Sequence, residues 1–537
     1  MSATPQDQAA TVSLDGAMFI GAERVTGDGA EVRSVNPQTG DALDPPYRYG
    51  GADVVDRACR LADEAFDDYR ATSPGQRAHF LERIAHHLTA ATDALVERAH
   101  LETGLPTARL TGEVARTTGQ LRLFAEVLRE GGWYGARIDP ALPDRAPQPR
   151  PDIRQLRIPV GPVAVFGASN FPLAFSVLGG DTASALAAGC PVVVKAHDAH
   201  LGTSELAAHA IRAAVTEAGL PDGVFSLLIG DGPILGGRLV RDPRVQAVGF
   251  TGSRAAGLAL SQAAAERPEP IPVYAEMSSI NPVVLLPGAL TERADALATG
   301  FVGSLTLGAG QFCTNPGLVL AVADAGLDAF LRSAAKRVES DAGATMLTPH
   351  IARSYRTESA AVAAHPEVTV LARGTAADSA APGQALLMSV SGEAFLADPG
   401  LQREMFGAAA LVVRCDDLSQ LTEVLRGLEG QLTATVHTAD SDLDRARALL
   451  PLLERRAGRV LFNSWPTGVE VGHAMVHGGP YPATSDGRST SVGSLAIDRF
   501  LRPVSYQDVP EALLPAPLRD DNPYGVPRRV EGKLTSE

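Results

Sequence analysis

The chain has 537 residues, of which 45% are hydrophobic and 20% charged, and its formal net charge is −15. This length predicts two or more domains with room to bury a cofactor, and the composition is that of a folded globular enzyme. The negative charge argues against general affinity for nucleic acid or anionic membranes, because both would repel the protein. Small molecules are therefore the expected partners.

Cysteine usage predicts a reducing compartment. The four cysteines, which are Cys59, Cys190, Cys313 and Cys415, are far apart and show no CxxC spacing. Neither a zinc site nor a disulfide framework is expected, so we predict no metal. The N-terminus lacks the pattern of a signal peptide, and the most apolar stretch, residues 296–309, is too short to span a membrane. These observations predict a cytoplasmic protein.

The first 158 residues are predicted to be mainly helical. The expected elements are a hairpin-like segment at 18–32, a turn at 36–41, a helix at about 74–103, a helix at about 108–130 and a proline-rich connection at 140–151. The helix at 74 begins with a capping box formed by Ser73 and Gln76, with proline at its first position. The run of prolines that follows the second helix excludes a further helix there.

From residue 159 short apolar runs alternate with helical stretches, as in a doubly wound, mostly parallel sheet. The predicted strands are 163–166, 192–194, 224–229, 247–250 and 283–286, and one intervening helix is 204–217. A second α/β region is expected at about 290–480, with helices at 327–340 and 418–427. Residues 485–507 are prone to β-structure, and the tail beyond 510 has no core pattern.

Three residues are candidates for catalysis. Cys313, in Gly310-Gln311-Phe312-Cys313-Thr314, is either a thiol nucleophile or a buried small apolar residue. Asn170 follows a predicted strand and is either an amide donor to an oxyanion or a turn residue. Glu276 lies among apolar and small residues, where burial is expected to raise its pKa toward that of a general base; the alternative is a structural carboxylate.

Other segments suggest a nucleotide site. Lys195 ends a buried strand, where ligands of open α/β sheets bind, although a surface lysine is an equal alternative. Gly252 and Ser253 connect a strand to a helix start and are predicted either to hold a phosphate or to cap the helix. The glycines at 230–236 do not fit the GxGxxG fingerprint. Glu404 precedes Phe406, an aromatic residue able to pack on a cofactor ring.

In this order, the segments resemble the aldehyde dehydrogenase superfamily over most of the chain. The resemblance implies that Cys313 is the nucleophile, Asn170 the side-chain donor of the oxyanion hole and Glu276 the base for the deacylating water. It also implies that Lys195 and Glu404 hold the cofactor riboses, Phe406 packs by the nicotinamide, and Gly252 and Ser253 lie at the pyrophosphate.

Three longer segments, 275–282, 311–317 and 477–486, are similar to the 2,5-dioxovalerate (α-ketoglutarate semialdehyde) dehydrogenase branch. This implies oxidation of that semialdehyde to 2-oxoglutarate; the alternatives are a fatty aldehyde or a catalytically silent binding protein. Arg116 or Arg122 is expected to bind a substrate carboxylate, with solvated arginines as the alternative, and Phe171 is a further substrate candidate.

The branch resemblance implies NADP, whereas Asp198, three residues after Lys195, would repel a 2′-phosphate and allows NAD. The implied fold has a Rossmann-type cofactor domain, an α/β catalytic domain and a small β oligomerisation arm, and predicts a homodimer or homotetramer. The predicted boundaries are 1–139 and 159–285 for the cofactor domain, 286–484 for the catalytic domain, 140–158 and 485–510 for the arm, and 511–537 for the tail.

Overall fold

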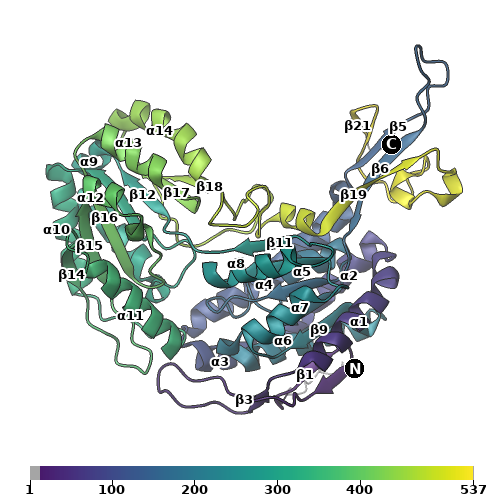
Figure 1. The fold of residues 1–537 in the computed structure, drawn as a ribbon, viewed down its shortest axis with the longest axis horizontal. Helices are drawn as coiled ribbons and strands as arrows, with labels where there is room; N and C mark the ends of the chain where they lie inside the picture. Colours follow the sequence, from purple (N-terminus) through teal and green to yellow (C-terminus); the bar gives the residue numbers. More distant parts are fainter. Residues whose placement is uncertain (1–12, 536–537) are drawn as a thin grey trace, which may run out of the picture.

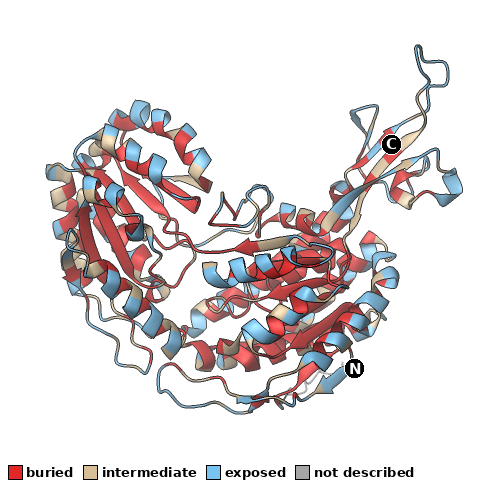
Figure 2. Ribbon diagram, viewed as in Figure 1, coloured by how far each residue is buried: buried red, intermediate tan, exposed pale blue. Residues whose placement is uncertain are grey.

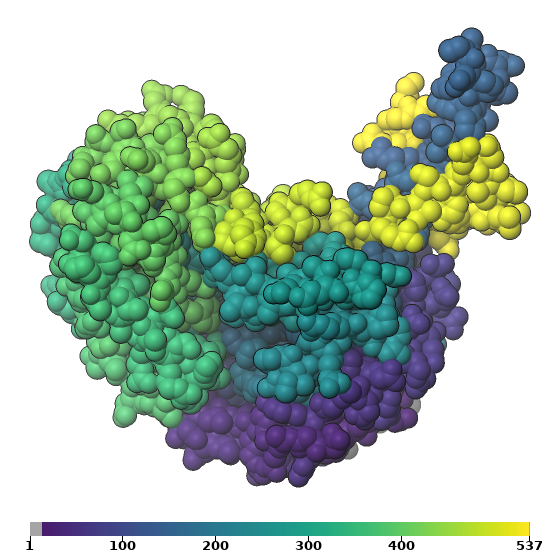
Figure 3. Space-filling model, viewed as in Figure 1, coloured from purple at the N-terminus to yellow at the C-terminus, as the bar shows by residue number. Residues whose placement is uncertain are grey.

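The computed structural model describes residues 13–535 and consists of two α/β lobes and a projecting arm (Figure 1). The space-filling view shows the two lobes in broad contact, with the arm standing away from both (Figure 3). Both sheets are buried between helices, and the exposed residues gather on the outer helix faces and on the arm (Figure 2). No helix among residues 13–535 is long and apolar enough to cross a membrane.

The first lobe contains a seven-stranded sheet in the order β11 (Val273–Glu276), β10 (Ala247–Thr251), β7 (Val163–Phe166), β8 (Val192–Lys195), β9 (Phe225–Leu228), β1 (Met18–Ile20) and β2 (Glu23–Val25). The five strands from β11 to β9 are parallel, so their carboxyl ends share one edge. The covering helices are α1 (Ala52–Arg70), α2 (Pro74–Ala90), α3 (Thr92–Thr103), α4 (Thr107–Glu130), α5 (Gly180–Ala188), α6 (Leu201–Glu217), α7 (Gly237–Arg241) and α8 (Arg254–Ala265). A separate two-stranded sheet pairs β3 (Glu31–Val32) with β4 (Tyr47–Arg48) in antiparallel orientation.

The second lobe repeats this design. Its sheet has the order β14 (Thr369–Arg373), β15 (Leu386–Ser391), β16 (Ala409–Cys415), β13 (Leu318–Val322), β12 (Pro282–Leu285), β17 (Gln431–His437) and β18 (Ala457–Phe462). Only β14 is antiparallel to its neighbour. The helices are α9 (Pro287–Thr306), α10 (Ala325–Glu339), α11 (Pro349–Ala363), α12 (Gly392–Ala397), α13 (Leu418–Gly427) and α14 (Leu443–Arg456).

The arm is a five-stranded sheet in the order β19 (Leu501–Gln507), β6 (Ile153–Pro159), β5 (Ala136–Asp139), β20 (Arg528–Val530) and β21 (Lys533–Thr535). The tail was expected to lack a core, but it contributes two of these strands and buries Leu518 and Val526. The pattern was missed because the buried positions are separated by prolines and turns, so no helical or strand period links them.

Several predicted boundaries were wrong. The helix expected at 74–103 is interrupted at Ala91, where ψ rises to 11°. Helix α1 was missed, although its buried residues follow a helical period. Strand β12 belongs to the second sheet, so the chain changes lobes near residue 280 rather than after 285. Only β19 forms a strand within 485–507, because a 3₁₀-helix occupies Ser494–Phe500. The alternation of strands and helices and the capping box of Ser73 were predicted correctly.

Candidate active site

A cleft of about 930 Å³ lies between the two lobes. One wall is formed by the carboxyl ends of the parallel strands in the first lobe, where ligands of open α/β sheets bind. The opposite wall comes from the second lobe. The residues predicted from the sequence that line this cleft are Asn170, Lys195, Asp198, Gly252, Ser253, Glu276, Cys313, Glu404 and Phe406. Residues distant in the sequence are thus brought to one surface.

Cys313 lies in a turn between the 3₁₀-helix Leu307–Gly310 and β13, not at a helix N-terminus. The buried Asn281 side chain fixes this turn, because its Nδ2 donates to the carbonyls of Cys313 at 2.8 Å and Asn315 at 2.9 Å. Gly310 has φ +74°, and a Cβ there would lie 2.2 Å from the backbone carbon of Gly407. Glycine therefore allows the Cys313 turn to approach the loop that carries Glu404 and Phe406.

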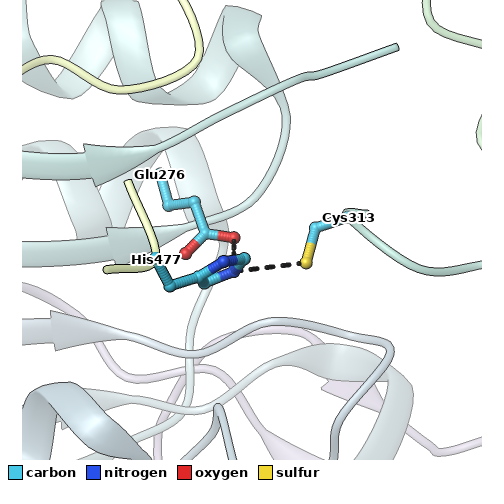
Figure 4. A group of neighbouring side chains, drawn as sticks. All are labelled: Glu276, Cys313 and His477. Carbon is cyan, nitrogen blue, oxygen red and sulfur yellow. Dashed lines mark hydrogen bonds and ion pairs between the residues drawn. The ribbon is translucent and has the colours of Figure 1, made fainter. Parts of the chain in front are cut away.

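Glu276 ends β11 and points toward Cys313, with His477 beside both (Figure 4). His477 Nε2 lies 3.4 Å from Cys313 Sγ and 2.9 Å from Glu276 Oε1. The other carboxylate oxygen of Glu276 accepts a 2.8 Å hydrogen bond from Ser491 Oγ. Three groups able to carry protons therefore meet at one point in the cleft.

The electrostatic environment of Glu276 and Cys313 differs from the one that the sequence predicted. Burial opposes ionisation of Glu276, but His477 and the hydrogen bond from Ser491 outweigh it and hold the pKa of Glu276 below its ordinary value. Burial, reinforced by the negative charge of Glu276, raises the pKa of the Cys313 thiol well above its ordinary value. Burial acts in the predicted direction, but the predicted net rise of the Glu276 pKa was wrong, because the sequence did not reveal these partners. The resting pair is a carboxylate beside a thiol.

Asn170 is buried on the loop after β7, and its Nδ2 donates to the Gln311 carbonyl at 3.0 Å, two residues before Cys313. Arg109 of α4 donates from Nη2 to the Asn170 carbonyl at 2.8 Å. The same guanidinium stacks on the rings of Phe171 and Phe312 at 5.0 and 4.8 Å. Arg109 thus fixes the Asn170 backbone against the Cys313 turn, so that the amide faces the site.

At the carboxyl end of β8, Lys195 Nζ donates to Asp198 Oδ1 at 3.2 Å. The Tyr49 hydroxyl donates to the other oxygen of Asp198 at 2.8 Å. These two contacts fix the position of the Asp198 carboxylate at this part of the cleft. Ser253 caps α8, because its Oγ accepts a hydrogen bond from Ala256 N, and this was one of the two roles predicted for it. Ser253 also lines the cleft.

Glu404 lies on the second wall, in the loop that approaches Cys313. Its burial raises its pKa to about 7. Phe406 follows on the same wall and is half-buried. Lys195 and Glu404 therefore line the same cleft from opposite walls. This arrangement is compatible with the predicted binding of a dinucleotide.

The two arginine candidates on α4 lie in different environments. Arg116 is half-buried and stacks at 4.9 Å on Phe175, which packs in turn on the His477 ring. It interacts electrostatically with Cys313 and Glu276. Arg122 is exposed, interacts electrostatically with Glu82 and does not line the cleft. Phe171 packs edge-on against Phe312 at 5.4 Å, next to the Cys313 turn.

Three residues with a role in this geometry were missed by the sequence reasoning: Arg109, Asn281 and His477. His477 and Asn281 lie within the segments quoted for the branch, and Asn281 has φ +47°, which asparagine tolerates better than most residues. Arg459 of β18 also interacts electrostatically with Cys313, although its guanidinium donates to the carbonyls of Pro466 and Gly468. No local signal in the sequence points to Arg109 or Arg459.

Comparison with known proteins gives a consistent picture. Residues 25–496 match the aldehyde dehydrogenase family. The chain is 58% identical over 523 residues to alpha-ketoglutaric semialdehyde dehydrogenase 2 of Azospirillum brasilense, covering 97% of this chain and all of that protein. It is 47% identical over 522 residues to alpha-ketoglutaric semialdehyde dehydrogenase of Acinetobacter baylyi, covering 97% and 99%.

The fold is also found among solved structures. A 1-pyrroline-5-carboxylate dehydrogenase from Thermus with bound NAD superimposes with a TM-score of 0.77 at 21% identity, covering 91% of this chain and 92% of that one. At this identity the likeness concerns the fold alone. The family match and the two full-length relatives carry the assignment: this chain belongs to the aldehyde dehydrogenase family.

Proposed function

We propose that this protein oxidises α-ketoglutarate semialdehyde to 2-oxoglutarate with a nicotinamide cofactor. The observation that carries the proposal is the convergence of Cys313, Asn170 and Glu276 in the interlobe cleft, in a chain 58% identical to a relative named for this reaction. The intact set argues against a silent binding protein, because each group has the chemistry that its step needs.

In this mechanism Cys313 gives its thiol proton to the hydrogen-bonded carboxylate of Glu276, which releases it to solvent, and Sγ attacks the aldehyde carbon to form a tetrahedral thiohemiacetal. Its oxyanion is stabilised by Asn170 Nδ2 and the Cys313 backbone N–H; removing one such donor typically costs about 10²- to 10³-fold in rate. A bound NAD or NADP would supply the acceptor for the hydride that leaves the thiohemiacetal carbon, and Cys313 then holds the acyl group as a thioester. Glu276, ionised in the resting site, then takes a proton from the water that hydrolyses the thioester.

The cleft fits a dinucleotide on two observations. It has a volume of about 930 Å³, and it is lined by Lys195 on the wall from the first lobe and by Glu404 on the wall from the second. We assign the ribose contacts to these two residues, the pyrophosphate contact to Gly252 and Ser253, and the packing by the nicotinamide to Phe406.

Aldehyde dehydrogenases use NAD or NADP, and the branch resemblance suggested NADP. The contacts of Asp198 support NAD instead, because Tyr49 and Lys195 hold this carboxylate in place at the cleft. A 2′-phosphate beside it would meet a like charge, whereas ribose hydroxyls would find an acceptor. We therefore propose that the protein prefers NAD.

The substrate carboxylate is assigned to Arg116. Among the described residues its guanidinium makes one hydrogen bond, a 3.4 Å contact with the Val469 carbonyl, so donors remain for a ligand. A buried charge-assisted hydrogen bond contributes about 1.5–3 kcal/mol. A fatty aldehyde has no carboxylate to pair with the Arg116 guanidinium. It is the second candidate substrate, because the rings of Phe171 and Phe312 form an apolar surface next to the Cys313 turn. Phe171 is assigned to the wall beside the aldehyde carbon.

The test compares kcat/KM for α-ketoglutarate semialdehyde, a neutral short aldehyde and a long-chain aldehyde, each with NAD and NADP. We expect the semialdehyde with NAD to give the highest value and Cys313→Ala to be inactive. Arg116→Gln is expected to reduce kcat/KM for the semialdehyde about 10- to 100-fold more than kcat/KM for the neutral aldehyde, which it changes only through its charge on Cys313 and Glu276.

Arg122→Gln, on the exposed face of the same helix, is the matched control and is expected to behave as the wild type. A preference for the long-chain aldehyde would refute the substrate assignment. Equal effects of Arg116→Gln on charged and neutral aldehydes would refute the role of Arg116.

We also propose a homodimer or homotetramer. Strands β18 and β19 each pair on one side only within residues 13–535, and unpaired edges of this kind are suited to pairing with another copy. Light scattering coupled to size-exclusion chromatography tests this. The four cysteines are free thiols, which supports the predicted location in the cytoplasm.

A further inference from the structure

Glu113 is a buried carboxylate of α4 that lies against the loop carrying Asn170. Its Oε1 accepts hydrogen bonds from the backbone N–H groups of Leu173 at 2.9 Å and Ala174 at 3.0 Å. Only 3% of Glu113 is exposed, and each of the two donor residues is 1% exposed. Because a buried backbone N–H needs an acceptor, the carboxylate satisfies two groups that lie away from water. The reaction steps proposed above give this carboxylate no role.

The segment that Glu113 contacts is a single tight turn. Phe175 N donates to the Phe171 carbonyl at 3.3 Å and closes the turn. Pro172 has no N–H, and the N–H groups of Leu173 and Ala174 find no carbonyl within the turn, as at the start of a helix. A carboxylate is a favourable acceptor at such a position. The side chain from α4 therefore caps this turn.

A second residue of α4 holds the other end of the same loop. Arg109 Nη2 donates to the Asn170 carbonyl at 2.8 Å. Arg109 and Glu113 are four residues apart, so they lie on one face of the helix. Asn170 Nδ2 in turn donates to the Gln311 carbonyl at 3.0 Å. The direction of the Asn170 amide is thus set by α4 on one side and by the Cys313 turn on the other.

The charge of Glu113 is a separate effect from its hydrogen bonds. Glu113 interacts electrostatically with Arg109 and Arg116 of the same helix. Burial raises the pKa of Glu113, and the two N–H groups and the arginines oppose this rise. Its Oε2 is buried and has no hydrogen-bond partner among the described residues. Because Oε1 makes both bonds to the turn, a proton on Oε2 would not remove them, and the contact depends on the length of the side chain.

We propose that Glu113 is the positioning residue that aims the Asn170 amide at the oxyanion. It acts through the turn at 171–175, whose N–H groups it holds, so that Nδ2 of Asn170 is already in place when the aldehyde oxygen becomes negative. The donor then needs no reorganisation during the attack of Cys313. This inference rests on the aldehyde oxidation proposed above. It implies that Glu113 affects the steps that form an oxyanion and leaves the thiol itself unchanged.

Two conservative variants separate the length of the side chain from its charge. Glu113→Gln keeps the length and an acceptor oxygen but loses the charge, whereas Glu113→Asp keeps the charge and withdraws the oxygen by one methylene. With a neutral short aldehyde and NAD, we expect the burst of reduced cofactor to stay within about threefold of the wild-type rate in Glu113→Gln and to fall about 10- to 100-fold in Glu113→Asp. Glu126→Asp, on the exposed face of α4, is the matched control and is expected to retain the wild-type burst.

Alkylation of Cys313 by iodoacetamide reports on the nucleophile alone, because displacement of iodide forms no oxyanion. Followed by peptide mass spectrometry, its rate is expected to stay within about twofold of wild type in both Glu113 variants. A double-mutant cycle links the effect to the donor. In the Asn170→Ala background we expect Glu113→Asp to cause no further loss of burst rate, since the group that Glu113 positions is already absent.

The proposal is overturned by a Glu113→Asp burst within about threefold of wild type, by an equal loss of burst and alkylation, or by a loss that adds to that of Asn170→Ala. A loss in Glu113→Gln but not in Glu113→Asp would show that charge matters instead, and would equally overturn it. If Glu113→Asp does not fold, Glu113→Met, which keeps the length without an acceptor oxygen, replaces it with the same expectations. A wild-type protein that gives no burst with any aldehyde would refute the proposed function itself, and this role with it.

Discussion

Asn281 gives the sharpest test of how the fold positions Cys313. Its side chain is fully buried, and its Nδ2 donates to the carbonyls of Cys313 and Asn315, while its Oδ1 accepts from the hydroxyls of Ser279 and Thr433. Asn281→Gly removes these four contacts but tolerates the positive φ of 47°. The variant therefore isolates the hydrogen bonds from backbone strain.

The expected magnitude follows from the Cys313 carbonyl, which is left without a donor, whereas the Asn315 carbonyl keeps the N–H of Gly317 at 2.8 Å. A buried group without its partner costs about 1–3 kcal/mol, so the Cys313 turn is destabilised by about that amount before water enters. A misplacement of the nucleophile by about 1 Å costs about 10²-fold in rate. We expect kcat/KM to fall by about that factor, whereas the cofactor Kd stays close to wild type because Lys195 and Glu404 are unaffected.

The assay combines steady-state kinetics, cofactor binding by fluorescence and a thermal melt. Asn463→Gly is the matched control, since Asn463 also has a positive φ of 52° in the second lobe but does not contact the Cys313 turn. We expect it to lower Tm without loss of kcat/KM. If Asn281→Gly lowers Tm but keeps kcat/KM within threefold of this control, Asn281 does not position the nucleophile.

Three further predictions concern the cofactor and the arm. Because Glu404 has a pKa of about 7 and is neutral below it, the KM for the cofactor should fall as pH rises through about 7, and Glu404→Gln should remove this dependence; an unchanged profile would argue against a ribose contact. Asp198→Ser should raise kcat/KM with NADP and lower it with NAD, and a uniform loss with both would contradict the proposed selectivity. Removing residues 511–537 should lower Tm, because burial of Leu518 and Val526 contributes about 3–6 kcal/mol; an unchanged melt would mean that the tail does not stabilise the arm.

The sequence alone predicted the fold class correctly and named the candidate catalytic residues that the cleft brings together. Cys313, Asn170 and Glu276 each lie in a short segment whose residue types are unusual together, and Lys195 ends a run of valines that reads as a buried strand. These patterns involve residues close together in the sequence, so they can be recognised without knowledge of the tertiary packing. Strands β7, β8 and β10 and helices α4 and α13 were found for the same reason, because apolar runs and helical periods act within one element.

Tertiary structure decided what surrounds these residues. Arg116 and Arg122 lie on one helix about 120° apart in direction, and only the packing of α4 shows that the first approaches Cys313 while the second faces solvent. The Glu276 pKa is lowered rather than raised because the return segment at 477–491 brings His477 and Ser491 to the end of β11. Contacts between residues about 200 positions apart depend on how the lobes pack, and no local pattern encodes them.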